Sequence, residues 1–316
     1  MTTPAWSVTS NAMPADGSRV VVAVDGRELR LSNLDKVLYP QAGTTKAAVI
    51  DYYTRIADVM LPHLRDRPLT MVRHPDGVGG PFFFEKRCPP HHPDWLPTVD
   101  LGRLGRDKVV SHCDLRERAA LVWAANLAAL ELHVPMGRAP DPYVPTMVVF
   151  DLDPGPPAGM AEAATVAGWL FDVFDRLGLE AFAKTSGSKG LQVYVPVNDD
   201  DATYDQTKGF ALRVGQLLER VHPTSVLTSM DKAARAGKVF IDWSQNVPLK
   251  TTVAVYSLRA RDRPSISTPV TRDELAAAAT GAPLHFEIGD VLARVEEQGD
   301  LFAATLELYQ DLPDLG

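Results

Sequence analysis

The sequence is short of cysteine, of long apolar runs and of repeats, and each shortage excludes a class of protein. Two cysteines in 316 residues cannot build the disulfide framework of a small secreted domain, so a reducing cytoplasm is the expected compartment. No apolar stretch is long enough to span a bilayer, and the N-terminus lacks the basic-then-apolar pattern of a secretory signal. Internal repeats and low-complexity blocks are missing too. We therefore expect a globular protein without membrane association.

Positive charge is also scarce, because the formal net charge is −8. The charge is unevenly spread, however: residues 273–316 carry a net charge of −9, the rest of the chain sums to +1, and residues 27–108 carry +3. A local basic face on an acidic protein is compatible with a nucleic-acid partner. An ordinary mixed surface would give the same numbers, so the charge distribution alone does not show whether the protein binds nucleic acid.

Local patterns predict an α+β fold. Residues 20–32 are typical of a hairpin around Asp-Gly, residues 44–64 of a helix capped by threonine, and residues 116–134, apolar nearly all round, of a buried helix. The second half predicts strands and helices in turn, at 148–153, 161–177, 181–185, 191–197, 205–221 and 238–243. We expect a flexible lead-in over residues 1–20, and then one two-lobed catalytic domain over 21–316, with central antiparallel or mixed sheets flanked by helices.

The stretch "VVFDLDPGP" (148–156) ends an apolar strand with two carboxylates. Asp151 and Asp153 share one face because strand side chains alternate, and the following Pro-Gly stops the strand. In "KVFIDW", Asp242 is a third acid on an otherwise apolar strand, which is costly for a charge that nothing positive meets. Three carboxylates from two strands suit two divalent cations that clamp a phosphoryl displacement. The alternative is a solvated Asp-x-Asp turn and an unrelated buried aspartate paired to an arginine.

The loop "SGSKG" lies between two predicted strands and can face an anion. Ser186, Gly187 and Gly190 allow a tight turn with inward N–H groups, and Lys189 supplies a point charge. The loop lacks the spacing of a Walker motif and precedes a strand, so it is not a P-loop. A plain hairpin turn with an exposed lysine is the alternative.

Two families share parts of this pattern. A haloacid-dehalogenase-type phosphatase also places Asp-x-Asp after four apolar residues, but here proline follows, 150 residues precede the motif, and no paired acids close the site. From about residue 28 onward the sequence instead resembles the archaeo-eukaryotic primase superfamily, most closely the polymerase module of bacterial ligase D. The stretches that carry the resemblance occur in the family's order: "LSNLDKVLYP", "TTKAAVIDYY", "LPHLRDRPLTMVRHPDG", "FFFEKR", "LELHVP", "VVFDLDPG", "KTSGSKGL", "KAARAGKVFIDWSQN" and "TTVAVYSLRAR".

The resemblance implies template-directed transfer of nucleotides or ribonucleotides from nucleoside triphosphates to a primer 3′-hydroxyl, at gaps or broken DNA ends, with two Mn²⁺ or Mg²⁺ ions. No lysine-centred ligase motif is present and the length leaves no room for a ligase or nuclease module, so we expect a stand-alone primase-polymerase. The implied partners are primer-template DNA, a Ku-like end-binding protein and a separate DNA ligase, for a monomer in the cytoplasm at the nucleoid. A de novo primase, an inactive nucleotide- or DNA-end-binding subunit, and the phosphatase remain as alternatives.

The resemblance also implies roles for individual residues. It makes Asp151, Asp153 and Asp242 metal ligands, and Asp242 also orients the primer hydroxyl. The remaining matches are to positions that bind the nucleotide (Ser186, Gly187, Lys189, Gln192, His133, Arg235, Gln245 and Arg259), the template base (Phe83 and Phe84) and a 5′-phosphate (Lys36 and Lys46). Each has a structural alternative: at least one of Phe82–Phe84 should be a core residue, His133 can cap a buried helix, and the two lysines can be surface charges.

Two further features concern nitrogen and sulfur ligands. The family usually has histidine where this chain has Gln192, which keeps an N–H₂ donor but never carries a positive charge. Zinc ligands are present by type at Cys88, His91, His92, His112 and Cys113. The adjacent pair His112–Cys113 does not have the usual spacing of two to four residues, so the pattern does not favour a zinc site.

Overall fold

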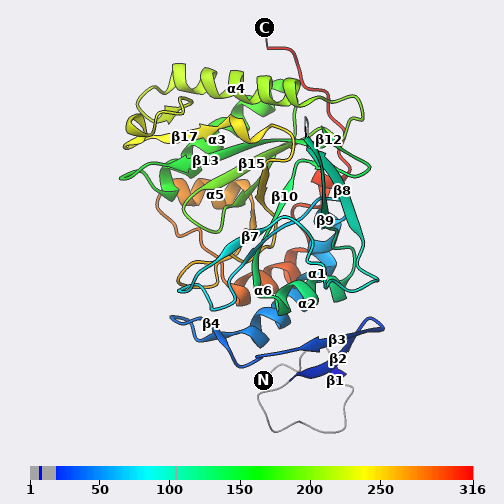
Figure 1. Ribbon diagram of the computed structural model, residues 1–316. Helices are drawn as coiled ribbons and strands as arrows, with labels where there is room; N and C mark the ends of the chain where they lie inside the picture. Colours follow the sequence, from blue (N-terminus) through cyan, green and yellow to red (C-terminus); the bar gives the residue numbers. More distant parts are fainter. Residues whose placement is uncertain (1–6, 9–18, 104–105, 316) are drawn as a thin grey trace. The chain divides into compact units, whose positions relative to one another are not determined.

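The computed structural model describes residues 7–8, 19–103 and 106–315, and the chain divides into two compact units (Figure 1). Unit 1 comprises Met1–Val134, Tyr256–Ser265 and Glu287–Gly299, and unit 2 comprises Pro135–Val255, Ile266–Phe286 and Asp300–Gly316. Helices and mainly antiparallel sheets are present in both, which confirms the α+β class. No helix in the described ranges is long and apolar enough to cross a membrane.

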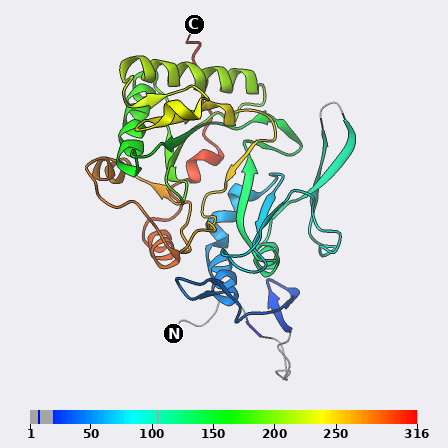
Figure 2. The same ribbon diagram turned by 60° about the vertical axis from the view of Figure 1, so that its left-hand side comes forward.

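Unit 1 combines helices with small antiparallel sheets, including a hairpin of β8 and β9 that is drawn in teal in Figure 2. Most of the expected lead-in lies outside the described residues, but Ser7–Val8 forms a strand, β1, that pairs with β2. The other elements are β2 (Val20–Val24), β3 (Arg27–Leu31), β4 (Val37–Tyr39), β5 (Thr44–Thr45), α1 (Lys46–Leu64), β6 (Thr70–Arg73), β7 (Phe83–Glu85), β8 (Thr98–Arg103), β9 (Arg106–Cys113), α2 (Arg118–Asn126), β10 (Ala129–Pro135) and α6 (Ile288–Gln298).

Two local predictions for unit 1 are confirmed. Strands β2 and β3 form the hairpin expected over residues 20–32, because Asp-Gly supplies a tight turn between alternating strands. Helix α1 begins where Thr45 accepts a hydrogen bond from Ala48 N, and it buries Val49, Ile56 and Met60 on one face. The caps and the apolar period are both readable from the sequence.

The helix predicted over residues 116–134 is wrong in its second half. Helix α2 ends at Asn126, Ala128 adopts a left-handed backbone with φ of 56°, and β10 follows, antiparallel to β6. All but one residue of β10 are buried. A run that is apolar on every side does not distinguish a buried helix from a buried strand, because both lose their periodicity when all faces are covered. His133 therefore lies in a strand and does not cap a helix.

Unit 2 contains a six-stranded sheet in the order β16-β17-β13-β15-β14-β19. All its neighbouring strands are antiparallel except β16 and β17, which are parallel. The elements of unit 2 are β11 (Gly137–Arg138), β12 (Asp141–Pro145), β13 (Met147–Pro154), α3 (Met160–Leu177), β14 (Phe182–Thr185), β15 (Leu191–Pro196), α4 (Tyr204–Val221), β16 (Val226–Leu227), η1 (Lys232–Arg235), β17 (Val239–Asp242), η2 (Trp243–Gln245), β18 (Thr251–Val253), β19 (Pro269–Val270), α5 (Arg272–Ala279) and η3 (Ala303–Leu306).

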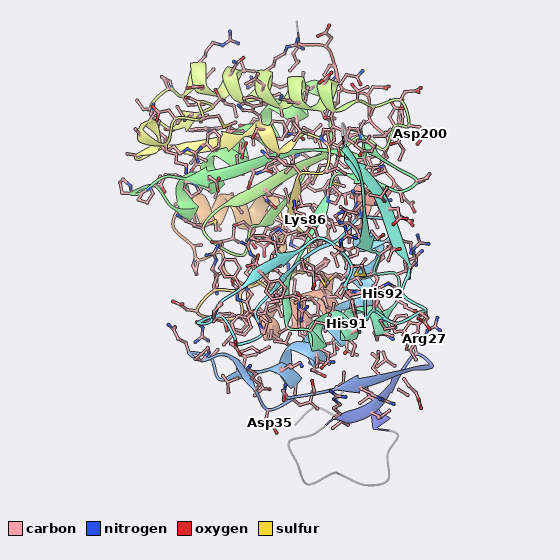
Figure 3. All side chains as sticks on the ribbon, viewed as in Figure 1. Arg27, Asp35, Lys86, His91, His92 and Asp200 are labelled. Carbon is pink, nitrogen blue, oxygen red and sulfur yellow. A yellow bond between two sulfur atoms is a disulfide. The ribbon has the colours of Figure 1, made fainter. Side chains whose placement is uncertain are left out.

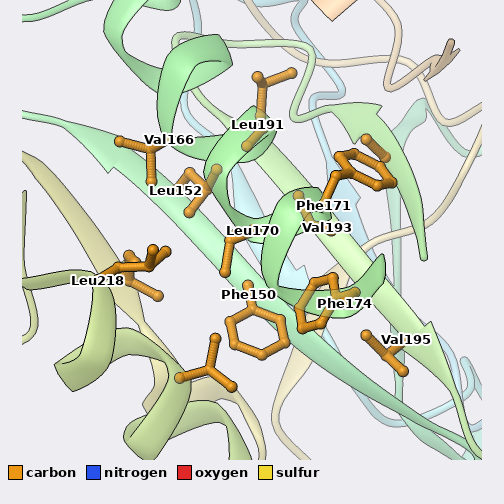
Figure 4. Close-up of a cluster of buried hydrophobic side chains, with 14 of the residues drawn as sticks. Phe150, Leu152, Val166, Leu170, Phe171, Phe174, Leu191, Val193, Val195 and Leu218 are labelled. Atoms are coloured by element: carbon orange, nitrogen blue, oxygen red, sulfur yellow. The ribbon is translucent and has the colours of Figure 1, made fainter. Parts of the chain in front are cut away.

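Strand alternation gives this sheet one apolar and one polar face. Alternate residues of β13, β15 and β17 join α3 and α4 in a single core cluster (Figure 4). Phe150 and Phe174 are completely buried at its centre, with ring centroids 5.3 Å apart. The residues between these core positions point to the opposite face. That second face therefore receives the polar side chains of the central strands.

The two cysteines are joined in a disulfide, which was not expected from the sequence. Cys88 N donates to Ser111 O at 2.7 Å, so the segment after β7 runs beside the end of β9, and the Cys88 and Cys113 Cα atoms lie 4.8 Å apart. Both sulfurs are therefore bonded to each other, and neither is a thiolate ligand for zinc. His91 and His92, labelled in Figure 3, lie on the intervening segment.

Candidate active site

Three aspartates share the polar face of the six-stranded sheet. Asp151 and Asp153 alternate with buried Leu152 on β13, and Asp242 lies directly opposite Asp151 in the β13–β17 ladder. Directly opposite residues in adjacent strands have neighbouring Cβ atoms. The register therefore joins the two acidic motifs into one carboxylate cluster.

The cluster shows the expected signs of crowded negative charge. Burial and then the charge of Asp153 raise the pKa of Asp151 to about 7, and Asp242 adds to the effect. Burial and the charge of Asp242 also raise the pKa of Asp153, against lowering by Arg235 and Lys189. A carboxylate that resists ionisation among like charges is stabilised by a cation.

The donor set fits hard divalent cations, because all three side chains offer carboxylate oxygens. Asp242 is held by neighbours: its Oδ1 accepts from Ser244 N at 2.9 Å and Ser244 Oγ at 2.6 Å, and its Oδ2 accepts from Gln245 Nε2 at 3.1 Å. Within the described residues, no three His, Cys, Asp or Glu side chains are gathered into a ready metal site. The assignment of the three aspartates as ligands of divalent cations therefore rests on their carboxylate chemistry and on their placement in the two strands.

The "SGSKG" loop is a tight turn between β14 and β15, as predicted. Ser186 Oγ accepts from Ser188 N and Gly190 N, each at 3.2 Å, and Ser186 N donates to Gly190 O at 2.9 Å. Gly187 has a φ of 65°, and a Cβ on Gly190 would lie 2.2 Å from Leu152 O, so both positions require glycine. Lys189 is exposed on this turn, and its charge reaches Asp153.

Arg235 lies on the same polar face. Its guanidinium stacks 3.8 Å from the centroid of the Phe240 ring, and Phe240 is the residue opposite Asp153 in the ladder. The buried Nε of Arg235 has no hydrogen-bond partner in the described part of the chain. A stacked arginine with an unused buried donor fits an anionic ligand such as a triphosphate.

Gln192 lies between Asp151 and Lys184 on the polar face of the sheet. The side chain is buried, Nε2 donates to Asp151 Oδ1 at 3.1 Å, and Oε1 accepts from Lys184 Nζ at 2.6 Å. Both ends of the amide are thus engaged within the sheet face. The structure directs Gln192 toward the carboxylates.

The candidate nucleotide residues of unit 1 form a group of their own around Glu131. Glu131 Oε2 lies 2.8 Å from His133 Nε2, and Oε1 lies 3.2 Å from Arg259 Nε and accepts from Ala260 N at 3.0 Å. Burial opposes ionisation of Glu131, but His133 and Arg259 prevail and lower its pKa to about 2. Glu131 is therefore ionised at neutral pH and contacts both side chains.

Strand β7 and the residue before it, Phe82, carry an exposed aromatic patch. Phe82, Phe83 and Phe84 are 56%, 43% and 62% exposed, so the expectation that at least one would be a core residue is wrong. Phe82 stacks on His74 at 5.1 Å and Arg73 lies 5.1 Å from the Phe83 ring. Exposed aromatic rings of this kind are available to stack on a planar ligand group.

Lys36 and Lys46 form a small basic group, and the two side chains differ in exposure and in hydrogen-bond partner. Lys36 is an accessible cation that pairs with Asp76 at 2.7 Å, whereas Lys46 is buried and donates to Ser32 O at 2.7 Å. Burial, Lys36 and Arg73 lower the pKa of Lys46 to about 8. A buried lysine whose charged form is disfavoured fits an anionic ligand such as a phosphate, which would stabilise that form.

Three residues with site contacts were missed from the sequence. Glu131 and Lys184 are charged side chains within otherwise apolar strands, the same signal that identified Asp242. Asn246 is completely buried, accepting from Val149 N at 2.9 Å and donating to Val149 O at 2.7 Å. It thereby ties η2 to β13 beside the aspartates. No local pattern marks Asn246.

Comparison with known proteins decides the family. The model of the LigD primase-polymerase domain matches residues 45–302. The chain belongs to the LigD primase-polymerase domain family. It is 43% identical over 277 residues to the multifunctional non-homologous end joining protein LigD of Mycolicibacterium smegmatis, covering 87% of this chain and 36% of that protein. The bifunctional LigD of Bacillus subtilis is 29% identical over 286 residues, covering 90% of this chain and 45% of that protein.

A solved LigD structure has the same fold. The polymerase domain of Mycobacterium tuberculosis ligase D, in complex with DNA, is 41% identical with a TM-score of 0.83, covering 88% of this chain and 98% of that one. The present chain spans 36% of the length of the mycobacterial LigD proteins. Membership of the LigD primase-polymerase family removes the phosphatase interpretation of Asp-x-Asp.

Proposed function

We propose that this chain is a template-directed nucleotidyltransferase that adds nucleotides to a primer 3′-hydroxyl at gaps or broken DNA ends. The observation that carries the proposal is the carboxylate cluster of Asp151, Asp153 and Asp242 on one sheet face of a LigD primase-polymerase domain. Two cations, Lys189 and Arg235, act on Asp153 from the same unit. DNA as the partner is supported by the DNA bound to the M. tuberculosis polymerase domain.

The three aspartates would hold the divalent cations, for which we propose two Mn²⁺ or Mg²⁺ ions. Such ions, when bound, neutralise charge on the attacking and leaving oxygens of a phosphoryl transfer. The protein contributes placement: β13 and β17 fix the carboxylates before a substrate arrives, so little reorganisation is needed at the reaction. Lys189 and Arg235 would draw the triphosphate toward that face, which makes catalysis largely a matter of positioning.

The other candidate residues would bind the remaining parts of the substrates. Exposed phenylalanines stack on template bases, a contact worth ~1–3 kcal/mol per base. The proposed contacts are to the triphosphate and the catalytic strand (His133, Arg259, Ser186, Gly187 and Gln245), the template (Phe83 and Phe84) and a downstream 5′-phosphate (Lys36 and Lys46). We further propose a monomer acting at the nucleoid in the cytoplasm, with a Ku-like end-binding protein and a DNA ligase as partners.

A primer-extension assay tests this function. The substrate is a gapped primer-template with a 5′-phosphorylated downstream strand, supplied with each ribo- or deoxyribonucleoside triphosphate, in Mn²⁺, in Mg²⁺ or in chelator. The expected result is a ladder that follows the template sequence and disappears in chelator. Comparing the two metals and the two sugars identifies the preferred ion and nucleotide.

The alternatives give different products. Products made without a primer would identify a de novo primase. DNA binding without any product in either metal would identify an inactive end-binding subunit and contradict the proposed activity.

A further inference from the structure

Four side chains of unit 2 form a row across the six-stranded sheet. The register sets Asp242 opposite Asp151, Asp151 opposite Gln192, and Gln192 opposite Lys184, on β17, β13, β15 and β14 in turn. All four project from the polar face, because the residues next to them in each strand belong to the core. The row runs from two carboxylates through an amide to an ammonium group.

The ammonium end fixes the orientation of the amide. Lys184 Nζ donates to Gln192 Oε1 at 2.6 Å, and Tyr194 Oη donates to the same oxygen at 3.0 Å. An ammonium group has donors alone, so it selects the amide oxygen and turns Nε2 away. Gln192 Nε2 therefore faces Asp151, to whose Oδ1 it donates at 3.1 Å.

Lys184 is itself held rigidly. Its side chain is 1% exposed, and Nζ also donates to Val253 O at 3.0 Å and Ser267 Oγ at 2.7 Å. Ser267 Oγ in turn donates to Thr185 O at 2.8 Å. The bond from Lys184 to Gln192 is thus one of a set that fixes the ammonium group in a single position within the unit. The nearest acids in the row are the candidate metal ligands.

We propose that Lys184 is a positioning residue that acts through Gln192 to hold Asp151 in place as a metal ligand. The inference rests on the proposed function, since it assigns a role within the same site. It also changes the role of Gln192, which the family resemblance had placed among the nucleotide-binding residues. In this row, Gln192 Nε2 is a fixed hydrogen-bond donor to Asp151. Lys184 places a buried positive charge behind the three carboxylates.

Binding of Mn²⁺ alone tests the proposal without requiring turnover. The protein is unfolded thermally over a Mn²⁺ titration, with no nucleotide or DNA, for the parent, Lys184→Met and Gln192→Met. Removing an outer partner of a metal ligand typically weakens metal binding about 10–100-fold, so the half-saturating Mn²⁺ concentration should rise at least about tenfold in both variants. Lys238→Met, which loses one surface hydrogen bond to Pro223 O, is the matched control and should bind like the parent.

A conservative variant distinguishes positioning from packing. Neutral histidine offers one acceptor and one donor, so Gln192→His can accept from Lys184 and donate to Asp151, and it should restore most of the Mn²⁺ affinity. In primer extension at saturating Mn²⁺, the KM for the triphosphate in Gln192→Met should change less than about threefold, because the interaction lost is to the metal ligand.

Several outcomes would overturn the proposal. One is an unchanged Mn²⁺ half-saturation together with a raised KM, which would return Gln192 to the triphosphate. Another is a lower melting temperature with unchanged Mn²⁺ affinity, which would make the row structural. A parent protein that Mn²⁺ does not stabilise would also overturn it. A parent that binds Mn²⁺ but extends no primer would instead contradict the proposed function and leave the row testable.

Discussion

Glu131 of unit 1 is buried and Asp151 of unit 2 is half-buried, yet the pKa values of the two carboxyl groups move in opposite directions. Glu131 touches His133 and Arg259, which lower its pKa to about 2, whereas Asp151 has Asp153 and Asp242 nearby, and its pKa rises to about 7. Burial alone raises the pKa of both. The neighbours decide the difference: Glu131 already contacts Arg259 and His133, whereas the neighbours of Asp151 in the cluster are two further carboxylates.

The largest expected effect follows from removing a member of the carboxylate cluster. Asp153→Ala or Asp242→Ala should lower primer extension at least about 100-fold, because each removes a proposed metal ligand. The fold and DNA binding should persist, since loss of one of several like charges relieves repulsion. Melting temperature and DNA affinity are measured alongside the rate. The exposed Asp200, labelled in Figure 3, provides the control Asp200→Ala. Extension near the parent rate in either site variant would contradict the assignment.

The variant Glu131→Gln tests the environment in which the pKa of a carboxyl group is lowered rather than raised. The folded pKa of about 2 lies below the ordinary value of 4.5, so ionised Glu131 stabilises the fold by an amount of the order of 3 kcal/mol, fully present above pH 4.5 and lost as the pH falls toward 2. The variant should lose that free energy of unfolding at pH 7, and the difference from the parent should shrink below pH 4.5.

Denaturant titrations at pH 7 and pH 3 measure this effect, with exposed Glu28→Gln as the control. The KM for the triphosphate should rise in Glu131→Gln because His133 and Arg259 lose their common anchor. A stability difference that stays constant from pH 7 to pH 3 would show that the charge of Glu131 is unimportant.

The lysine group of unit 1 should give a smaller effect. Charge-assisted hydrogen bonds are worth ~1.5–3 kcal/mol, so the parent should bind a gap with a 5′-phosphate roughly tenfold or more tightly than the same gap with a 5′-hydroxyl. Lys36→Ala should reduce that preference and retain affinity for the hydroxyl gap. Lys36 is the better choice because Lys46 also supports the fold through Ser32 O. Equal losses on both substrates at one salt concentration would identify general backbone attraction instead.

The smallest effect is a pH-dependent stabilisation by metal. Because the pKa of Asp151 is raised to about 7, the folded protein keeps a proton that the unfolded chain releases above its ordinary value of 3.8. Without metal, stability should therefore fall as the pH rises from about 4 to about 7. Above that range the carboxylate is free to meet a cation.

The shift in melting temperature produced by Mn²⁺ should consequently be larger at pH 7.5 than at pH 5.5. Asp151→Asn, which cannot ionise, should reduce both the shift and its pH dependence. A shift that is equal at the two pH values in the parent would contradict the raised pKa.

The sequence determined what is local. Alternation along β13 was enough to place Asp151 and Asp153 on one face, a threonine cap and an apolar period located α1, and Pro-Gly ended β13. The family resemblance, now confirmed, added the activity class. These features were readable because each depends on residues within a few positions of one another.

Tertiary structure decided the rest. The residues in the row Asp242–Asp151–Gln192–Lys184 come from four strands spread over residues 151–242, and their order depends on strand register, which no single segment specifies. For the same reason the environment of Glu131, the exposure of Phe82–Phe84 and the helix-to-strand change after Asn126 were not readable locally. The charge of each side chain and the sheet face on which it lies follow from the local sequence. Its hydrogen-bond partners and its pKa depend on the distant strand that packs beside it.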